Sequence, residues 1–163
     1  MKRLLVAMVM ASVGLSVSIG SPALAQSDSV SATASVERQL HPLLTEMLLA
    51  ANAHDTDRYM TAFLRGPGLV FSFNGTIIQG WPELEAQQRK WWNNGKSDVV
   101  YSERRPSIIT VLSRDAAVLT MELESRRTAS NGQLAVGTAV VTMVYQKRPE
   151  GWRVVQAHES TVR

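Results

Sequence analysis

GWRVVQAHES, residues 151–160, is the stretch that decides the fold of this chain. The turn sequence Pro149-Glu150-Gly151 leads into it, and the β-branched and aromatic residues that follow favour a strand over residues 152–162. Successive side chains of a strand point to opposite faces of the sheet. One face therefore carries Trp152, Val154, Gln156, His158 and Ser160. Because its first two residues are apolar, we predict that this face points into the protein.

Three more strand-like segments precede this stretch, over residues 99–109, 116–127 and 134–147. The first is expected to bend or break near Pro106, and Asn131-Gly132 is a hairpin signal between the other two. Long strands joined by tight turns pair antiparallel. The C-terminal half is therefore predicted to be an antiparallel meander.

The N-terminal half begins with two predicted helices. Apolar residues recur at helical spacing over residues 36–51. Pro42 is tolerated in a first turn but not in mid-helix, so either the regular helix begins near Leu40 or a kinked turn precedes it. Asp55 can cap a second, shorter helix, because its carboxylate can accept from the free amides two or three residues on.

A hairpin and a third helix follow. Residues 69–73 and 76–79 are predicted strands around Asn74-Gly75, since both turn residues tolerate positive φ. The same Asn opens a glycosylation sequon, but the turn explains these residues better. The third helix is expected over residues 81–94, with Gly95 closing it. Helices covering one face of a curved sheet make an α+β arrangement.

The first 25 residues have the three-part pattern of a secretory signal peptide: a basic start, an apolar run and a small-residue Ala-Leu-Ala end. A membrane anchor is the alternative, but a spanning helix needs about 20 mainly apolar residues, and serines dilute this one. We therefore predict cleavage after Ala25 and a periplasmic or secreted protein without a membrane anchor. Residues 26–35, rich in Ser, Ala and Thr, are expected to be a disordered tether before one domain over residues 36–163.

Composition excludes several kinds of chemistry. The chain has no cysteine, so it forms no disulfide, thiolate nucleophile, Cys-ligated zinc site or iron–sulfur cluster. Removing Lys2 and Arg3 reduces the formal charge from +3 to +1, and no basic stripe of the kind that binds nucleic acid remains. The three histidines lack zinc-ligand spacing, and no phosphate-binding glycine motif is present. We expect neither a metal nor a cofactor, and no nucleic-acid partner.

Three motifs resemble the NTF2-like superfamily, specifically its SnoaL-like and DUF4440-type domains. AANAHDTDRY (residues 50–59) resembles the family's junction between its first two helices, FNGTIIQG (73–80) its hairpin, and GWRVVQAHES (151–160) its closing strand. The resemblance covers about residues 36–163. It implies a cone-shaped barrel in which three N-terminal helices pack on a curved antiparallel sheet around an apolar pocket. Relatives often pair through the outer face of the sheet, so we expect a homodimer.

His158 is the candidate catalytic residue. It shares a face with Trp152 and Val154, and a histidine in the pocket could act as a base or a donor. The alternative is a buried histidine satisfied by a neighbour such as Ser160. Some relatives carry a second histidine where Gln156 stands here, and its absence weakens a proton-relay interpretation.

Aromatic residues provide the predicted ligand pocket, which also includes His158. Aromatic walls with a few polar groups are typical of a small-molecule site, although they also describe a plain core. The five aromatic candidates are Tyr59, Phe73, Trp91, Trp92 and Tyr101. Trp91 and Trp92 are about 100° apart on a helix, so both cannot be centrally buried. Glu122 and Glu124 alternate with apolar residues and are expected on the solvent face or at a dimer interface, not as an acid/base pair.

Three functions are compatible with these residues, because the superfamily includes isomerases, dehydratases, cyclases, ligand carriers and association domains. The leading hypothesis is an exported domain that binds a small, largely apolar ligand in the aromatic pocket. The second is an isomerase, dehydratase or hydrolase that uses His158 as acid or base. The third is a non-catalytic homodimeric association module.

Overall fold

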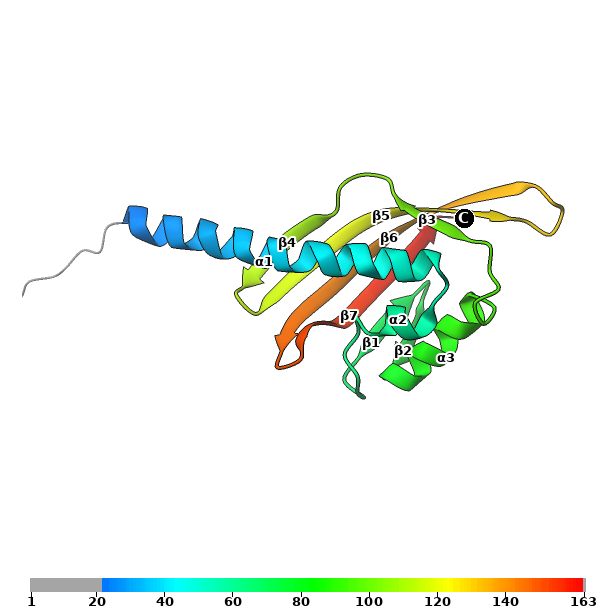
Figure 1. The fold of residues 1–163 in the computed structure, drawn as a ribbon, viewed down its shortest axis with the longest axis horizontal. Coiled ribbons are helices and arrows are strands. Elements are labelled where there is room, and N and C mark those ends of the chain that lie inside the picture. Colours follow the sequence, from blue (N-terminus) through cyan, green and yellow to red (C-terminus); the bar gives the residue numbers. More distant parts are fainter. Residues whose placement is uncertain (1–21, 163) are drawn as a thin grey trace, which may run out of the picture.

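The computed structural model describes residues 22–162, which form three helices and a seven-stranded sheet (Figure 1). In chain order the elements are α1 (Pro22–Asn52), α2 (Thr56–Met60), β1 (Val70–Phe73), β2 (Thr76–Gln79), α3 (Trp81–Trp91), β3 (Val100–Glu103), β4 (Ile108–Ser113), β5 (Ala116–Thr128), β6 (Leu134–Arg148) and β7 (Gly151–Val162). The α+β arrangement predicted from the sequence is confirmed, with α1 lying across one face of the sheet.

The sheet is mixed and open, which corrects the expectation of an antiparallel sheet closed into a barrel. Its strand order is β2-β1-β7-β6-β5-β3, with β4 also paired to β5. β1 runs parallel to β7, and the other pairs are antiparallel. The parallel pair places Phe73 opposite Glu159, although the two residues lie more than 80 positions apart in the sequence. Parallel strands need a long crossover, which no local turn signal reveals.

Helix α1 differs from its prediction at both places where the sequence argued for a break. Residues 26–35, the expected tether, are helical, and Pro42 lies inside the same continuous helix. Val36, Leu40 and Leu44 are buried at four-residue intervals on either side of the proline. The burial of these apolar side chains offsets the free-energy cost of the backbone hydrogen bond that Pro42 cannot donate. Between residues 22 and 162, no helix has the length and apolar character needed to span a membrane.

The predicted signal peptide falls almost wholly outside the described residues. Only its last four residues, Pro22–Ala25, are described, and they form the start of α1. Cleavage and export therefore remain predictions.

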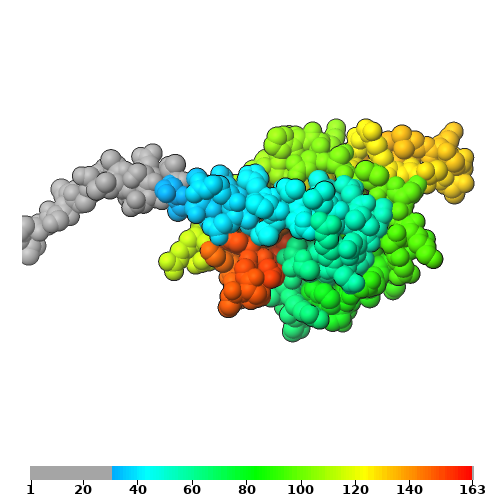
Figure 2. All heavy atoms as spheres, viewed as in Figure 1, coloured from blue at the N-terminus to red at the C-terminus, as the bar shows by residue number. Residues whose placement is uncertain are grey.

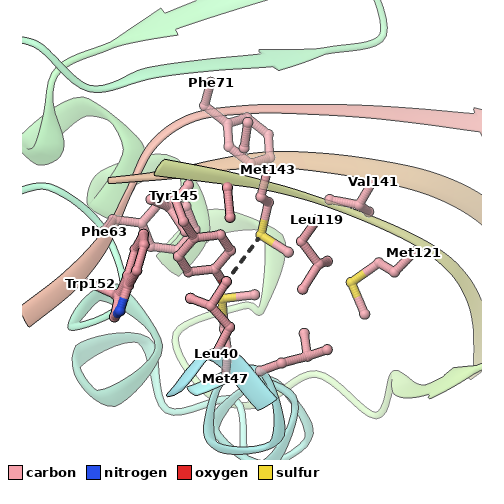
Figure 3. Close-up of a cluster of buried hydrophobic side chains, with 14 of the residues drawn as sticks. Leu40, Met47, Phe63, Phe71, Leu119, Met121, Val141, Met143, Tyr145 and Trp152 are labelled. Carbon is pink, nitrogen blue, oxygen red and sulfur yellow. Dashed lines mark hydrogen bonds between the residues drawn. The ribbon is translucent and has the colours of Figure 1, made fainter. Parts of the chain in front are cut away.

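The core lies between α1 and the concave face of the sheet. Leu40 and Met47 of α1 point toward Tyr145 of β6, and Phe63 lies beside Tyr145 (Figure 3). β5, β6 and β7 supply most of the sheet's buried side chains. Figure 2 shows α1 and α2 covering this face, while the β5–β6 hairpin projects past them.

Turn chemistry was predicted well where it is local. Asn74 and Gly75 both have positive φ, at 45° and 86°, as the two-residue hairpin requires. The second hairpin has a longer connection over residues 129–133, in which the Ala129 amide donates to the Gln133 carbonyl. The break near Pro106 is confirmed, because β3 ends before it and β4 begins after it. α3 ends at Trp91, earlier than residue 94, and Gly95 has positive φ as predicted.

Candidate functional site

A cavity of about 440 Å³ lies between the helices and the concave face of the sheet. All five aromatic residues that the sequence analysis placed in a pocket line it: Tyr59, Phe73, Trp91, Trp92 and Tyr101. Aliphatic side chains of α1, β5 and β6 make up much of the rest of the lining, together with a few polar side chains such as Gln88 and Ser125. Arg127 and Val136, which also border the cavity, are solvent-exposed at the base of the β5–β6 hairpin. The cavity therefore opens toward that hairpin.

The aromatic side chains form two contacting groups. The Trp91 ring lies between Phe71 and Phe73, with centroid distances of 5.9 and 4.9 Å. Tyr59 packs edge-on against Trp92 at 5.0 Å. Trp92 is buried while Trp91 is partly exposed, which confirms that the two cannot share one central position.

The position of Tyr101 depends on Asn52, a residue that the sequence analysis did not single out. The Asn52 side chain donates to the Tyr101 carbonyl at 3.0 Å and accepts from the Tyr101 amide at 2.7 Å. These two bonds attach β3 to the end of α1. The Trp92 Nε1 group then donates to the Tyr101 hydroxyl at 3.2 Å, which holds that hydroxyl at the cavity.

A β-bulge in β7 reverses the predicted orientation of His158. Val144 of β6 pairs with Gln156, and the next residue, Tyr145, pairs with Val154, so Val155 is an extra residue in β7. One inserted residue moves every later side chain to the other face of the sheet. His158 is exposed on the outer face, and the prediction that it faces the pocket is wrong.

The bulge places Glu159 at the cavity instead. Glu159 lies opposite Phe73 of β1 and Val141 of β6 and is partly buried. Burial raises the pKa of its carboxyl from 4.5 to about 6. Within residues 22–162, no side chain or amide donates a hydrogen bond to that carboxyl. The spacing of apolar residues signals the shift, because Val154 and Ala157 are three residues apart where regular alternation requires an even number.

Two tyrosine hydroxyls share the cavity with Glu159. Burial, and then the Glu159 charge, raise the pKa of Tyr59. Burial also raises the pKa of Tyr101, against a smaller opposing effect of its bond with Trp92. Both hydroxyls are therefore protonated at neutral pH and can donate to a bound molecule.

The carboxylates of β5 form no acid/base site. Glu122 pairs with Arg105, and Glu124 accepts from Arg126 at 2.7 Å, all on the outer face as predicted. Within the described part of the chain, no three His, Asp or Glu side chains gather in a way that could hold a metal ion.

Comparison with known families identifies the domain. The sequence profile described as the SnoaL-like domain matches residues 41–163. The chain belongs to the SnoaL-like family. Comparison with curated proteins gave no match.

Solved structures agree with this assignment of the SnoaL-like domain. An NTF2-like superfamily protein from Salmonella enterica is 23% identical with a TM-score of 0.69, covering 80% of this chain and 94% of its own. An NTF2-like protein with a cystatin-like fold from Novosphingobium aromaticivorans is 14% identical with a TM-score of 0.69, covering 88% and 92%. A ketosteroid isomerase-like protein from Erwinia carotovora is 16% identical with a TM-score of 0.62, covering 77% and 95%. At these identities the likeness shows the fold alone.

The SnoaL-like domain thus presents one carboxyl and two phenol hydroxyls in an aromatic cavity, beside other polar side chains such as Gln88 and Ser125. This set can bind an apolar molecule and offer it one acidic and two hydrogen-bonding contacts. His158, on the outer face, takes no part in that arrangement.

Proposed function

We propose that this SnoaL-like domain binds a small, largely apolar molecule in the cavity beneath α1. The observation that carries the proposal is a cavity of about 440 Å³ whose lining is mostly aromatic and aliphatic. Ligand sites are typically of roughly 300–1,000 Å³, with apolar walls and a few placed polar groups. Glu159, Tyr59 and Tyr101 would be those polar groups.

The size of the cavity argues against a plain core as the reason for these aromatic residues. Protein interiors are close-packed and leave few voids larger than a water molecule, whose share of liquid volume is about 30 Å³. A space of about 440 Å³ is far beyond such packing defects. An association module also has no need for a cavity, so this feature favours ligand binding over that alternative.

A thermal-shift screen of small aromatic and aliphatic compounds tests the proposal. A ligand at a hundredfold excess over its Kd stabilises the folded state by about 2.7 kcal/mol, which raises Tm by roughly 5 °C or more. Ala139→Trp should remove the response, because Ala139 lines the cavity. Leu134→Trp is the matched control, since Leu134 lies on the same strand, is 68% exposed and does not line the cavity. An equal response from the two variants would contradict the proposal, as would no response from wild type.

A second candidate is an enzyme that moves a proton within its ligand, with Glu159 in the role first assigned to His158. The raised pKa of Glu159 supports it, because an acid or base works best when its pKa is near the working pH. The likeness to a ketosteroid isomerase-like protein is compatible with such chemistry. Hydrogen–deuterium exchange beside the carbonyl of a bound ketone would detect it. Glu159→Gln should slow exchange by roughly 100-fold or more, and unchanged exchange would refute it.

We also propose that the domain pairs through the outer face of its sheet. Ile108 and Val140 lie on that face and are 61% and 43% exposed. A partner that covers this face would remove both side chains from water. The mass in solution, measured by analytical ultracentrifugation for wild type and Val140→Glu, tests this: a monomeric wild type would refute it.

We also propose that the protein is exported and that its signal peptide is cleaved. Cleavage after Ala25 would leave Gln26 as the first residue and shorten α1 at its start. The intact mass of the protein recovered from the periplasm of a bacterial host gives the cleavage position directly.

A further inference from the structure

The carboxyl of Glu159 lies in aromatic surroundings. Its partner in β1 is Phe73, whose ring centroid is 4.9 Å from that of Trp91. Tyr59, on the helical side of the cavity, is close enough for the Glu159 charge to raise its pKa. The acid therefore shares the cavity with the faces and edges of several rings.

Glu159 also differs from several carboxylates on the protein surface that have basic partners. Glu46 pairs with Arg58, and Glu124 with Arg126. Among the described residues, no Lys, Arg or His forms an ion pair with Glu159, although it is partly buried. A partly buried carboxylate has lost part of its hydration, and a bound cation would offset that cost.

The cation that borders the cavity, Arg127, is too far away to be that partner. Arg127 pairs with Ala135 of β6, whereas Glu159 pairs with Val141 of the same strand. Six residues of a strand span about 20 Å at roughly 3.3 Å per residue. The guanidinium of Arg127 is also exposed at the open end. The negative charge near Phe73 is therefore not neutralised from within the cavity.

We infer that the cavity selects molecules that carry a positively charged nitrogen on an apolar body, with the Glu159 carboxylate as the partner of that charge. The inference rests on the proposed ligand-binding function and names the chemical class of its ligand. An ammonium group is attracted both to a carboxylate and to the faces of aromatic rings. A neutral alcohol of the same shape has only a hydrogen bond to offer, and an anion is repelled.

Calorimetric titration with three molecules that share one apolar body tests the inference: 3-phenylpropylammonium, 3-phenylpropanol and 3-phenylpropanoate. At pH 8, where Glu159 is ionised, wild type should bind the ammonium compound about tenfold more tightly than the alcohol, and the carboxylate most weakly. Glu159→Gln should bind the ammonium compound and the alcohol equally. His158→Gln, the same kind of change at the next residue but on the outer face, should keep the tenfold preference.

A second measurement on the wild type needs no variant. Near pH 6 about half of the Glu159 carboxyls are protonated, so binding of the ammonium compound should release a fraction of a proton. Tyr59 on α2 and Tyr101 on β3, the ionisable groups whose pKa values respond to Glu159, stay protonated at this pH. The binding enthalpy should therefore differ between buffers of different ionisation enthalpy for the ammonium compound and not for the alcohol.

The outcomes separate the two proposals. Equal binding of the ammonium compound and the alcohol by wild type would overturn the inference and leave the ligand-binding function standing. Retention of the preference in Glu159→Gln would also overturn it. Failure of all three compounds to bind, together with an empty thermal-shift screen, would refute the ligand-binding function itself.

Discussion

The two parts of β7 place opposite sets of side chains against the core. Before the bulge, Trp152 and Val154 are buried and the odd-numbered residues face outward. After it, Ala157 is buried, Glu159 borders the cavity, and the even-numbered residues face outward. One inserted residue, Val155, separates these patterns.

The two parts of β7 also lie in different surroundings. The first part of β7 packs against α1, where Trp152 Nε1 donates to Gln39 at 3.2 Å, and the space there is filled. The second part pairs in parallel with β1 and forms part of the cavity. The bulge therefore lies where β7 passes from the closely packed core to the cavity. Bulges are frequent next to functional sites.

Ala157→Asp should have the largest effect on this comparison. Ala157 is 1% exposed because the bulge turns it inward, whereas strict alternation from Val154 would place it on the outer face. A carboxylate buried there without a partner should lower the free energy of unfolding by roughly 5 kcal/mol. Urea denaturation measures this, and His158→Asp, the same change at the exposed neighbouring residue, is the control. Equal losses of stability in the two variants would contradict the bulged register.

Trp152→Ala should have the next largest effect, in the first part of the strand. Trp152 is 5% exposed and lies among buried side chains that include Phe63 and Leu40 (Figure 3). Loss of a buried Trp side chain costs about 3–5 kcal/mol. Gln156→Ala, outward-facing in the second part, should change the free energy of unfolding by less than about 0.5 kcal/mol. Similar losses in both variants would contradict the assignment of faces.

Glu159→Gln tests the second part of the strand through pH. The folded-state pKa of Glu159 is raised from 4.5 to about 6. The neutral carboxyl, present below pH 4.5, does not destabilise the fold, but its ionisation lowers the free energy of unfolding as pH rises through 6. The shift corresponds to about 2 kcal/mol. Relative to wild type, the Gln variant should therefore gain about 2 kcal/mol between pH 4 and pH 8. Urea denaturation at both pH values checks this, and a difference that is the same at both would count against the raised pKa.

Local signals in the sequence were enough for most of the fold. Asp55 caps α2 as predicted, with its carboxylate accepting from the Arg58 amide at 3.0 Å. Asn74-Gly75 turns as predicted for the same reason: the relevant interactions lie within a few residues. The parallel pairing of β1 with β7 was not predictable in this way, because its partners lie more than 80 residues apart. The composition of residues 26–35 predicted a disordered tether, because these residues are polar and small, but they form part of α1.

The aromatic part of the candidate site was predictable, and its acid was not. Large apolar side chains such as Phe73 and Trp91 must be buried somewhere, so the order of elements places them at the cavity. The choice between His158 and Glu159 depended on strict alternation along β7, which a single bulged residue breaks. Only the three-residue spacing from Val154 to Ala157 marks the break, and a small residue such as Ala is a weak signal of burial.

His158→Gln should have the smallest effect and is the sharpest check on the orientation of the second part of β7. His158 is exposed on the outer face, between Ser72 of β1 and Thr142 of β6. Its replacement should change the free energy of unfolding by less than about 0.5 kcal/mol and leave ligand affinity unchanged. Urea denaturation and calorimetry with the same ligand measure both. A large loss of affinity without loss of stability would mean that His158 reaches the ligand, and that β7 adopts the unbulged register in the bound protein.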